Sequence, residues 1–544
     1  MRMRNIISCT QSNKQLTLRE KVGQLFMPSA FINDTEEEIQ KLEKLISNQD
    51  VGSLCFFHSR ASAATNFEGV KAVVHNENSY ETLKSLIKRY QKAAKYPLLI
   101  AIDAEWGLAM RIENTPQYPY AITLGALADD QSDLIYKVAE NIAKDCRAAG
   151  IHWNLSPCVD INNNPDNPVI GYRSFGADKN KVTEKALAFI KGTQSAGILT
   201  SIKHFPGHGD TATDSHLTLP LIDKSKEELF ENELYPFQKL IDEGVDSVMV
   251  GHLSVRALSG GKIQSSSLSK KIIKGILREH MGYKGVVISD ALNMHAVAKN
   301  HPLKGELEWL AFDAGNDVLC FAEHIAEGIE TILKNASQEQ IEESFERVWK
   351  LKVHTQVSSS SSSSSSRPSS SSSSSLTSNS NLISPNTLNR KIAVESLTLY
   401  KGSAKLISDF RETDFLGACF PEKMDNQFFK NINPNIAFKS ISSFDGVLKE
   451  RANILLALFP PQVKPTHKFG FAKEELIFIN ELIQTKNVVL YLFGNPYVLN
   501  HINYEKTKAV VIAYQNFEVF QEIAAEHFMG NLEAKGKLSV KIRA

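Results

Sequence analysis

The sequence of 544 residues contains only six cysteines, and none of them forms a CxxC pair. Cysteines scattered in this way indicate neither a disulfide framework nor a zinc site, so we expect free thiols. No apolar run approaches the roughly 20 residues that a membrane-spanning helix needs. Basic and acidic side chains number 61 each, so the net charge does not argue for nucleic acid or a membrane surface as a partner.

The N-terminus, MRMRNIISCTQ, allows two interpretations. Two arginines followed by Ile-Ile-Ser-Cys resemble the end of a bacterial lipoprotein signal, in which Cys9 would carry the lipid. The apolar stretch is shorter than the roughly 7–15 residues of a working signal core. We therefore expect a cytoplasmic protein, with a periplasmic protein or a lipoprotein as the alternative if the true start lies upstream.

A low-complexity tract divides the chain. Residues 358–366 and 369–375 are all serine, with Arg367-Pro368 between them. Such a tract has no apolar surface to bury and is expected to be a flexible linker. The sequence therefore predicts a tail at 1–14, a first domain at 15–355, a serine-rich linker at 356–384 and a second domain at 385–544.

Short apolar runs alternate with amphipathic segments before the linker. The predicted strands are Val51–Phe57, Leu98–Asp103, Ile151–Leu155, Ile198–His204, Ser247–His252, Val286–Asp290 and Asp317–Phe321. The predicted helices are Glu36–Ser47, Glu81–Ala93, Lys181–Ser195, Lys226–Glu243 and Lys270–His280. Strands that alternate with helices in this way favour an α/β fold with a parallel sheet, closed as a (β/α)8 barrel of the TIM type.

The part after the linker shows the same alternation over a shorter length. Strands are expected at Ile454–Phe459, Val488–Phe493 and Val510–Tyr514, and helices at Lys473–Thr485 and Phe517–Met529. This pattern predicts an open α/β sandwich. Because this part has no glycine-rich phosphate loop, we expect no bound nucleotide.

Several strands of the first domain end in an ionisable residue. These residues are Asp103, Lys203, His204, His252 and Asp290. In a (β/α)8 barrel the carboxyl ends of the strands share one face, so these side chains are expected to converge there.

The segment from Lys203 to His216 is the richest in reactive groups. Asp214 and His216 are separated by one residue. A carboxylate that accepts a hydrogen bond from an imidazole fixes the tautomer of the imidazole and raises its basicity, as a histidine acid/base requires. The same residues could instead cap turns. A metal site is disfavoured because HxxxH lies on a Gly-Pro turn and lacks the helical face of zinc motifs.

Asp290 ends the run GVVISD and is a plausible nucleophile, although it could equally cap the helix that follows. Glycoside hydrolysis with retention needs an attacking carboxylate and a proton donor for the leaving oxygen. Asp103, Arg111 and Arg173 are polar groups suited to sugar hydroxyls.

These motifs resemble glycoside hydrolase family 3, in its β-N-acetylglucosaminidase branch. The branch signature, KH(F/I)PGHG followed by D-(S/T)-H, is present as KHFPGHGDTATDSH. The segments LTLREKVGQLF, DAEWGLAMR, SPCVDINNNPDNPVIGYRSFG, SVMVGH, GVVISDALNM and AGNDVLC extend the resemblance over residues 15–355. One departure is Trp106-Gly107, where many relatives carry Gly-Gly, and it bears on fine specificity.

The resemblance implies a retaining exo-β-N-acetylglucosaminidase, an enzyme that removes terminal, non-reducing β-linked N-acetylglucosamine. By position, Asp290 would be the nucleophile, and His216 would be the general acid/base, oriented by Asp214. The family's substrate-contacting positions are matched by Asp103, Arg111, Arg173, Lys203 and His204. No cofactor and no metal are expected. The C-terminal part resembles the family's second domain through AVESLTLY and GKLSVKI.

The expected substrates are glycans that contain N-acetylglucosamine, either muropeptides in peptidoglycan turnover or chitooligosaccharides. The alternatives within the family are a β-N-acetylglucosaminide phosphorylase, which uses phosphate instead of water, and a β-glucosidase. The Asp214–His216 pair argues against the β-glucosidase, whose acid is usually a carboxylate elsewhere. A carbohydrate-binding protein without catalysis belongs to another class, and it is disfavoured by the intact set of Asp290, Asp214 and His216.

Overall fold

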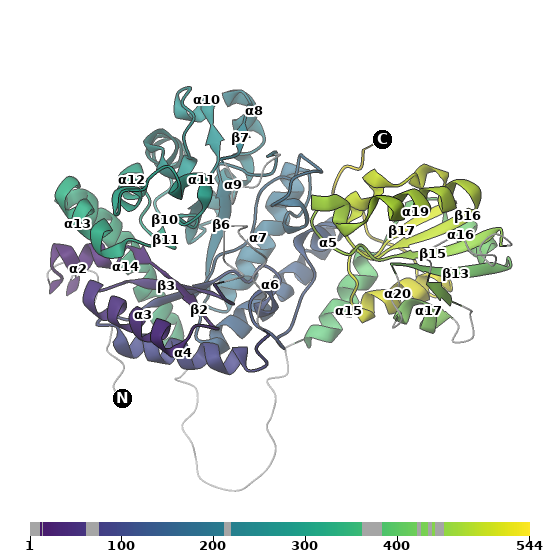
Figure 1. Cartoon of the computed structure of the whole chain (residues 1–544), viewed down its shortest axis with the longest axis horizontal. Coiled ribbons are helices and arrows are strands. Elements are labelled where there is room, and N and C mark those ends of the chain that lie inside the picture. The colour runs from purple at the N-terminus through teal and green to yellow at the C-terminus, as the bar shows by residue number, and fades with distance from the viewer. Residues whose placement is uncertain are drawn as a thin grey trace, which may run out of the picture. The chain divides into compact units, whose positions relative to one another are not determined.

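The computed structural model describes residues 11–12, 15–60, 75–211, 219–361, 383–421, 426–432, 438–440 and 451–543. Cys9, Asp214, His216 and most of the serine tract lie outside these residues. The chain forms two compact units (Figure 1). Unit 1 consists of Met1–Gln117, Val138–Asp160 and Phe189–Leu382, and unit 2 consists of Tyr118–Lys137, Ile161–Ala188 and Ile383–Ala544. Unit 2 thus includes two segments from the first 355 residues of the chain.

In the described part of unit 1, parallel strands form a curled sheet. Its order is β10-β8-β6-β5-β4-β3-β2. The bounds are β2 (Ser29–Phe31), β3 (Ser53–Phe57), β4 (Leu99–Ile102), β5 (Trp153–Asn154), β6 (Leu199–Phe205), β8 (Ser247–Val250) and β10 (Val286–Ser289).

Two further strands, β1 (Phe26–Met27) and β11 (Leu319–Cys320), join the edges of this sheet. β1 leads through Pro28 directly into β2, and it pairs with β11 in parallel. A parallel bridge joins Val318, just before β11, to Ile288 of β10. With β1 and β2 counted as one strand, eight parallel strands are hydrogen-bonded in a ring, as the predicted (β/α)8 barrel requires.

Helices follow most of the barrel strands in the chain, and α2 precedes the first of these strands. Their bounds are α2 (Leu18–Gly23), α3 (Glu36–Gln49), α4 (Ser79–Ala93), α6 (Ser132–Ala149), α7 (Lys179–Ser195), α8 (Lys226–Glu231), α9 (Tyr235–Asp242), η5 (Lys271–His280), α12 (Glu306–Ala314), α13 (Ile325–Asn335) and α14 (Gln338–Ser361). Capping boxes start α2, α3 and α8, in each of which a hydroxyl and a glutamate three residues later satisfy reciprocal backbone N–H groups.

Several elements differ from the sequence-based expectation. The first strand was not predicted, because it is short and Pro28 interrupts it. The predicted helix Lys226–Glu243 is two helices, α8 and α9, and Pro236 lies in the first turn of α9, where proline is tolerated. The backbone of α14 continues to Ser361, four residues into the serine tract, since extending an existing helix adds one hydrogen bond for each residue fixed.

Unit 2 contains a sheet whose described strands run in the order β12-β17-β16-β15-β13-β14. Their bounds are β12 (Thr398–Lys401), β13 (Phe415–Phe420), β14 (Phe438–Ser440), β15 (Asn453–Leu458), β16 (Asn487–Leu492) and β17 (Ala509–Ile512). Only β12 is antiparallel to its neighbour among these strands. The main helices are α15 (Pro385–Ser396), α16 (Ala404–Arg411), α17 (Gln427–Ile432), α19 (Lys473–Thr485) and α20 (Glu518–Phe528), with α19 and α20 on opposite sides of the sheet (Figure 1).

Candidate active site

The ionisable residues that end the predicted strands lie at one end of the barrel. Asp103 directly follows β4, and Asp290 directly follows β10. Lys203 and His204 lie near the carboxyl end of β6, and His252 lies two residues beyond β8. Because all these strands are parallel members of the ring, their carboxyl ends share one face, and the predicted convergence is confirmed.

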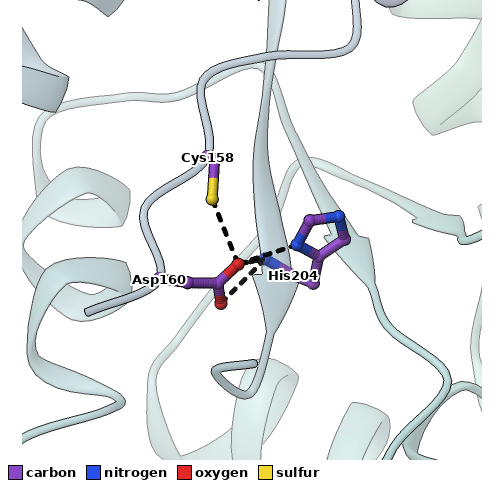
Figure 2. A group of neighbouring side chains, drawn as sticks. All are labelled: Cys158, Asp160 and His204. Carbon is purple, nitrogen blue, oxygen red and sulfur yellow. Dashed lines mark hydrogen bonds and ion pairs between the residues drawn. The ribbon is translucent and has the colours of Figure 1, made fainter. Parts of the chain in front are cut away.

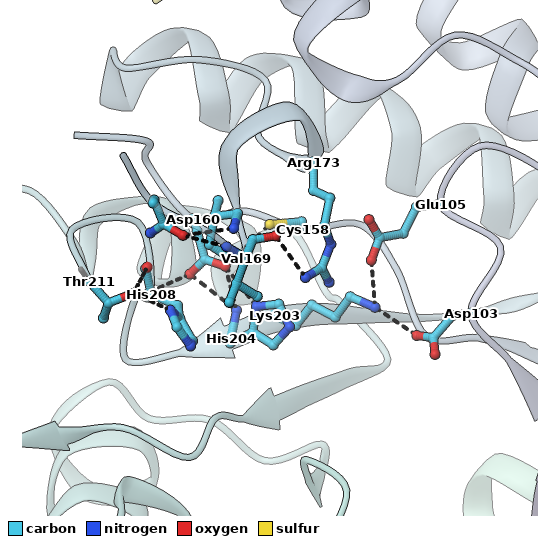
Figure 3. A network of polar contacts seen from close by, with 12 residues as sticks. Asp103, Glu105, Cys158, Asp160, Val169, Arg173, Lys203, His204, His208 and Thr211 are labelled. Carbon is cyan, nitrogen blue, oxygen red and sulfur yellow. Dashed lines mark hydrogen bonds and ion pairs between the residues drawn. The ribbon is translucent and has the colours of Figure 1, made fainter. Parts of the chain in front are cut away.

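Lys203 is the centre of a buried charge cluster. Its side chain is only 2% exposed, and its Nζ lies 2.8 Å from Oδ1 of Asp103 and 2.9 Å from Oε1 of Glu105. Figure 3 shows the lysine chain extended toward these two carboxylates. Arg111 adds a second cation, since its Nη2 lies 3.0 Å from Oδ2 of Asp103. The structure therefore brings together three of the predicted sugar-binding residues and adds Glu105.

This arrangement keeps Asp103 ionised. Burial by itself raises the pKa of the Asp103 carboxyl, but the charges of Lys203 and Arg111 outweigh burial and lower the pKa from 3.8 to about 2. A carboxylate in this state accepts hydrogen bonds and cannot donate them. The cluster thus offers an acceptor and two cationic donors at the carboxyl end of β4.

Asp160 is the centre of a second buried cluster, on the loop that follows β5. Its side chain is fully buried, and Oδ2 lies 2.7 Å from Nδ1 of His204. The backbone N–H of His208 donates to Oδ1 at 2.6 Å, and the thiol of Cys158 donates to Oδ2 at 3.2 Å. Figure 2 shows the thiol and the imidazole on either side of the carboxylate. Burial raises the pKa of Asp160, but the interactions of the carboxylate with His204 and His208 outweigh burial and lower the pKa from 3.8 to about 2.

His208 links this cluster to Asp290. Burial lowers the pKa of His208 to about 4, and the charge of Asp290 is near enough to oppose that shift. A hydrogen bond to Cys55 and burial raise the pKa of the Cys320 thiol in β11, and the carboxylates of Asp290 and Asp103 both add to this rise. Asp290 and Asp103 therefore act on the same region of the barrel interior.

His252 supports the turn that carries Asp290. Its Nε2 lies 2.9 Å from the carbonyl oxygen of Ala291, and its Nδ1 lies 2.8 Å from Oγ of Ser267. A carbonyl oxygen can only accept, so Nε2 carries the proton and donates it. The residue next to Asp290 is thus held by a buried imidazole.

One group of described side chains has the composition of a metal site, namely Cys158, Asp160 and His204. Their ligand atoms lie within 4.8 Å of one another. The thiol and the imidazole N–H both donate to the carboxylate, so the three side chains satisfy one another through hydrogen bonds. These hydrogen bonds account for the close approach of the three side chains.

The remaining predicted site residues are Arg173, Asp214 and His216. Arg173 belongs to unit 2, in the turn η3 (Gly171–Arg173), where its Nη1 donates to the carbonyl of Val169 at 3.4 Å. Asp214 and His216 lie outside the described residues. Sequence reasoning missed Glu105 and Asp160 as members of the site. Asp160 carried a usable signal, because it is an acidic residue shortly after a barrel strand, as Asp103 and Asp290 are.

The chain was compared with known proteins. Residues 17–351 match the family model described as the glycosyl hydrolase family 3 N-terminal domain. Beta-hexosaminidase A of Pseudoalteromonas piscicida is 32% identical over 348 residues, which are 59% of this chain and 56% of that relative. The chain thus spans little more than half the length of this relative. A beta-hexosaminidase of Psychromonas ingrahamii is 34% identical over 257 residues, which are 46% of this chain and 74% of the relative.

A solved structure matches over nearly the whole length. It is a glycoside hydrolase family 3 beta-N-acetylglucosaminidase from Paenibacillus sp. str. FPU-7, with a TM-score of 0.74 and 25% sequence identity. The match covers 97% of this chain and 99% of that one. The family model alone covers more than half of the sequence, and the relatives and the solved structure agree with it. The chain therefore belongs to glycosyl hydrolase family 3.

Proposed function

We propose that this protein is a retaining exo-β-N-acetylglucosaminidase that hydrolyses terminal, non-reducing β-linked N-acetylglucosamine. The observation that supports this most is the position of Asp290. It is a carboxylate at the carboxyl end of a barrel strand, close enough to affect the pKa of His208, on the face where Asp103 and Lys203 also lie. The names of the relatives, beta-hexosaminidase and beta-N-acetylglucosaminidase, agree with this substrate class.

In this proposal, the cluster around Lys203 binds the sugar. Ionised Asp103 accepts hydrogen bonds from sugar hydroxyls, while Lys203 and Arg111 keep it charged and donate in turn. Each of these side chains is mostly buried, so the contacts form at low dielectric, where they are stronger than in water.

The proposed reaction has two steps. Asp290 attacks the anomeric carbon and forms a covalent glycosyl-enzyme, while His216, oriented by Asp214, gives a proton to the leaving oxygen. In the second step His216 takes a proton from water, which then releases the sugar with its original configuration. A histidine suits this role because, unlike a second carboxylate, it brings no negative charge near the nucleophile.

The natural substrates in this proposal are glycan fragments with an N-acetylglucosamine end. Muropeptides from peptidoglycan turnover and chitooligosaccharides both qualify. Hydrolysis of each by the purified protein, compared at equal concentration, would rank the two classes.

The test uses an aryl β-N-acetylglucosaminide followed by proton NMR. We expect the β-anomer of N-acetylglucosamine to appear first; initial release of the α-anomer would contradict retention. His216→Ala should slow substrates with poor leaving groups more than activated ones, and equal losses would remove the acid role. Added phosphate should leave the product unchanged, whereas formation of the sugar 1-phosphate would identify a phosphorylase.

A further inference from the structure

The Asp160 carboxylate accepts hydrogen bonds from two neighbouring histidines, from Nδ1 of His204 and from the backbone N–H of His208. His204 follows Lys203 in β6, and His208 lies on the turn after that strand; their ring centroids are 5.8 Å apart. We propose that Asp160 is a positioning residue that holds the proton of His204 on Nδ1, so that Nε2 serves as a hydrogen-bond acceptor for a hydroxyl of the sugar. This inference rests on the proposed function, because the sugar is the partner of Nε2.

The first step of the argument concerns which atom carries the proton. Hydrogen-bond donors surround the Asp160 carboxylate, and an ionised carboxylate can only accept. Nδ1 of His204, at 2.7 Å from Oδ2, must therefore be the donor. The proposal takes His204 as the neutral imidazole, in which a proton on Nδ1 leaves Nε2 as an acceptor.

The second step concerns the fixed donors around the carboxylate. The backbone N–H of His208 donates to Oδ1 at 2.6 Å, and the backbone N–H of His204 lies 3.3 Å from Oδ1 and 3.2 Å from Oδ2. Backbone N–H groups cannot become acceptors, whereas an imidazole nitrogen can. Asp160 therefore fixes the His204 ring and the start of the His208 turn with one buried group.

This difference predicts the effect of Asp160→Asn. An asparagine keeps one oxygen and gains an NH2 group, and its oxygen should face the backbone N–H groups, which have no alternative. The NH2 group would then face His204, whose Nδ1 would have to accept, so the proton would move to Nε2. The substitution should thus convert Nε2 from an acceptor into a donor while it preserves the shape of the site.

The experiment compares aryl N-acetylglucosaminides in which each free ring hydroxyl is replaced in turn by fluorine, which cannot donate. At the position that His204 contacts, the wild type should lose about tenfold in kcat/KM from the missing hydrogen bond. In Asp160→Asn the acceptor is gone, so the loss at that same position should become clearly smaller. What remains is the lesser penalty of exchanging a hydroxyl for fluorine, a weaker acceptor, opposite the Nε2–H. The inductive effect of fluorine is the same in both proteins, so it cancels when the two losses are compared.

The matched control is Cys158→Ala, which removes the thiol donor from the same carboxylate oxygen but keeps the charge. Cys158→Ala should show the same loss in kcat/KM on fluorine substitution as the wild type. If Asp160→Asn also retains the wild-type loss at every position, the proposal is wrong.

Histidine 15N NMR of the wild type provides a second measurement that does not depend on a folded variant or on activity. The His204 signals, assigned by their absence in His204→Gln, should show a protonated Nδ1 and an unprotonated Nε2. A proton on Nε2 would overturn the inference. If the wild type fails to hydrolyse N-acetylglucosaminides, the proposed function fails, while the NMR result still decides the tautomer.

Discussion

Replacing Lys203 by methionine removes the cation that two buried carboxylates share. Methionine keeps most of the apolar chain, so the change is mainly one of charge. Asp103 retains Arg111 as a partner at 3.0 Å, whereas Glu105 loses its ion pair of 2.9 Å. The variant therefore leaves a buried negative charge without its main compensation.

The magnitude follows from two considerations. Removing one partner of a buried ion pair costs about 3–5 kcal/mol of stability. The pKa of Asp103 falls from 3.8 to about 2 despite burial, and such a shift corresponds to about 2–3 kcal/mol at neutral pH. Because Arg111 remains, we expect a loss near the lower limit, about 3 kcal/mol.

The loss should depend on pH. In the wild type, the lowered pKa of Asp103 stabilises the fold at pH values above the pKa of an unfolded aspartate, which is about 3.9. This stabilisation disappears as the pH falls through the pKa of Asp103 in the folded protein, which is about 2. In Lys203→Met, burial acts with less opposition and raises the pKa of Asp103 relative to the wild type. The carboxyl then protonates at higher pH, which relieves the buried charge, so the deficit should be largest near pH 7 and smaller near pH 4.

Scanning calorimetry of the wild type, Lys203→Met and the charge-keeping control Lys203→Arg would measure this. A loss of about 3 kcal/mol corresponds to a fall in Tm of about 4 °C for a unit of this size. We expect that fall at pH 7 for the methionine variant and a smaller one for the arginine variant. A methionine variant as stable as the wild type, or a deficit that is constant between pH 4 and pH 7, would refute this account of the cluster.

Three further substitutions test other contacts. Glu105→Gln weakens the second ion pair of Lys203, a charged contact worth about 1.5–3 kcal/mol, and should lower kcat/KM tenfold or more in steady-state assays; an unchanged value would make Glu105 a bystander. His252→Phe leaves the Ala291 carbonyl without its imidazole donor, at a cost of about 1–3 kcal/mol, and should reduce kcat more than it changes KM. Asp317 is a buried carboxylate just before β11 that pairs with Arg278 and Arg347, so we assign it a structural role. Asp317→Asn weakens both pairs and should lower the free energy of unfolding, measured in urea, by about 3 kcal/mol; a parallel loss of substrate affinity would contradict that role.

The sequence predicted most of the barrel because its strands are short apolar runs with an ionisable residue at the end. Asp103, Lys203, His204, His252 and Asp290 were all placed correctly at one end of the barrel by this rule. The rule depends only on the parallel order of the strands, which the alternation of strands and helices indicates.

The partners of these residues were not predictable in the same way. Glu105 lies three residues beyond the end of β4, and only the folded chain shows that Lys203, nearly a hundred residues away, reaches it. Asp160 lies six residues beyond β5. Its acidic side chain shortly after a barrel strand was a signal that it belongs to the site, but its contacts with His204 and His208 depend on the path of the loop. Such contacts depend on tertiary structure, and spacing along the chain does not encode them.

Local sequence patterns also failed to predict strands at the edges of the two sheets. β12 pairs antiparallel with β17, a strand more than a hundred residues later, so its place depends on a partner that is distant in sequence. The first barrel strand is divided by Pro28, whose missing N–H shortens the apolar run below the length of a recognisable strand.

The most direct test of the central claim is to trap the intermediate on Asp290. The full-length protein would be incubated with a 5-fluoro-N-acetylglucosaminyl fluoride, digested and analysed by mass spectrometry. We predict a stable sugar adduct on the peptide that contains Asp290, absent in Asp290→Asn. An adduct on a different residue, or turnover of N-acetylglucosaminides that Asp290→Asn retains in full, would contradict the assignment of Asp290 as the nucleophile.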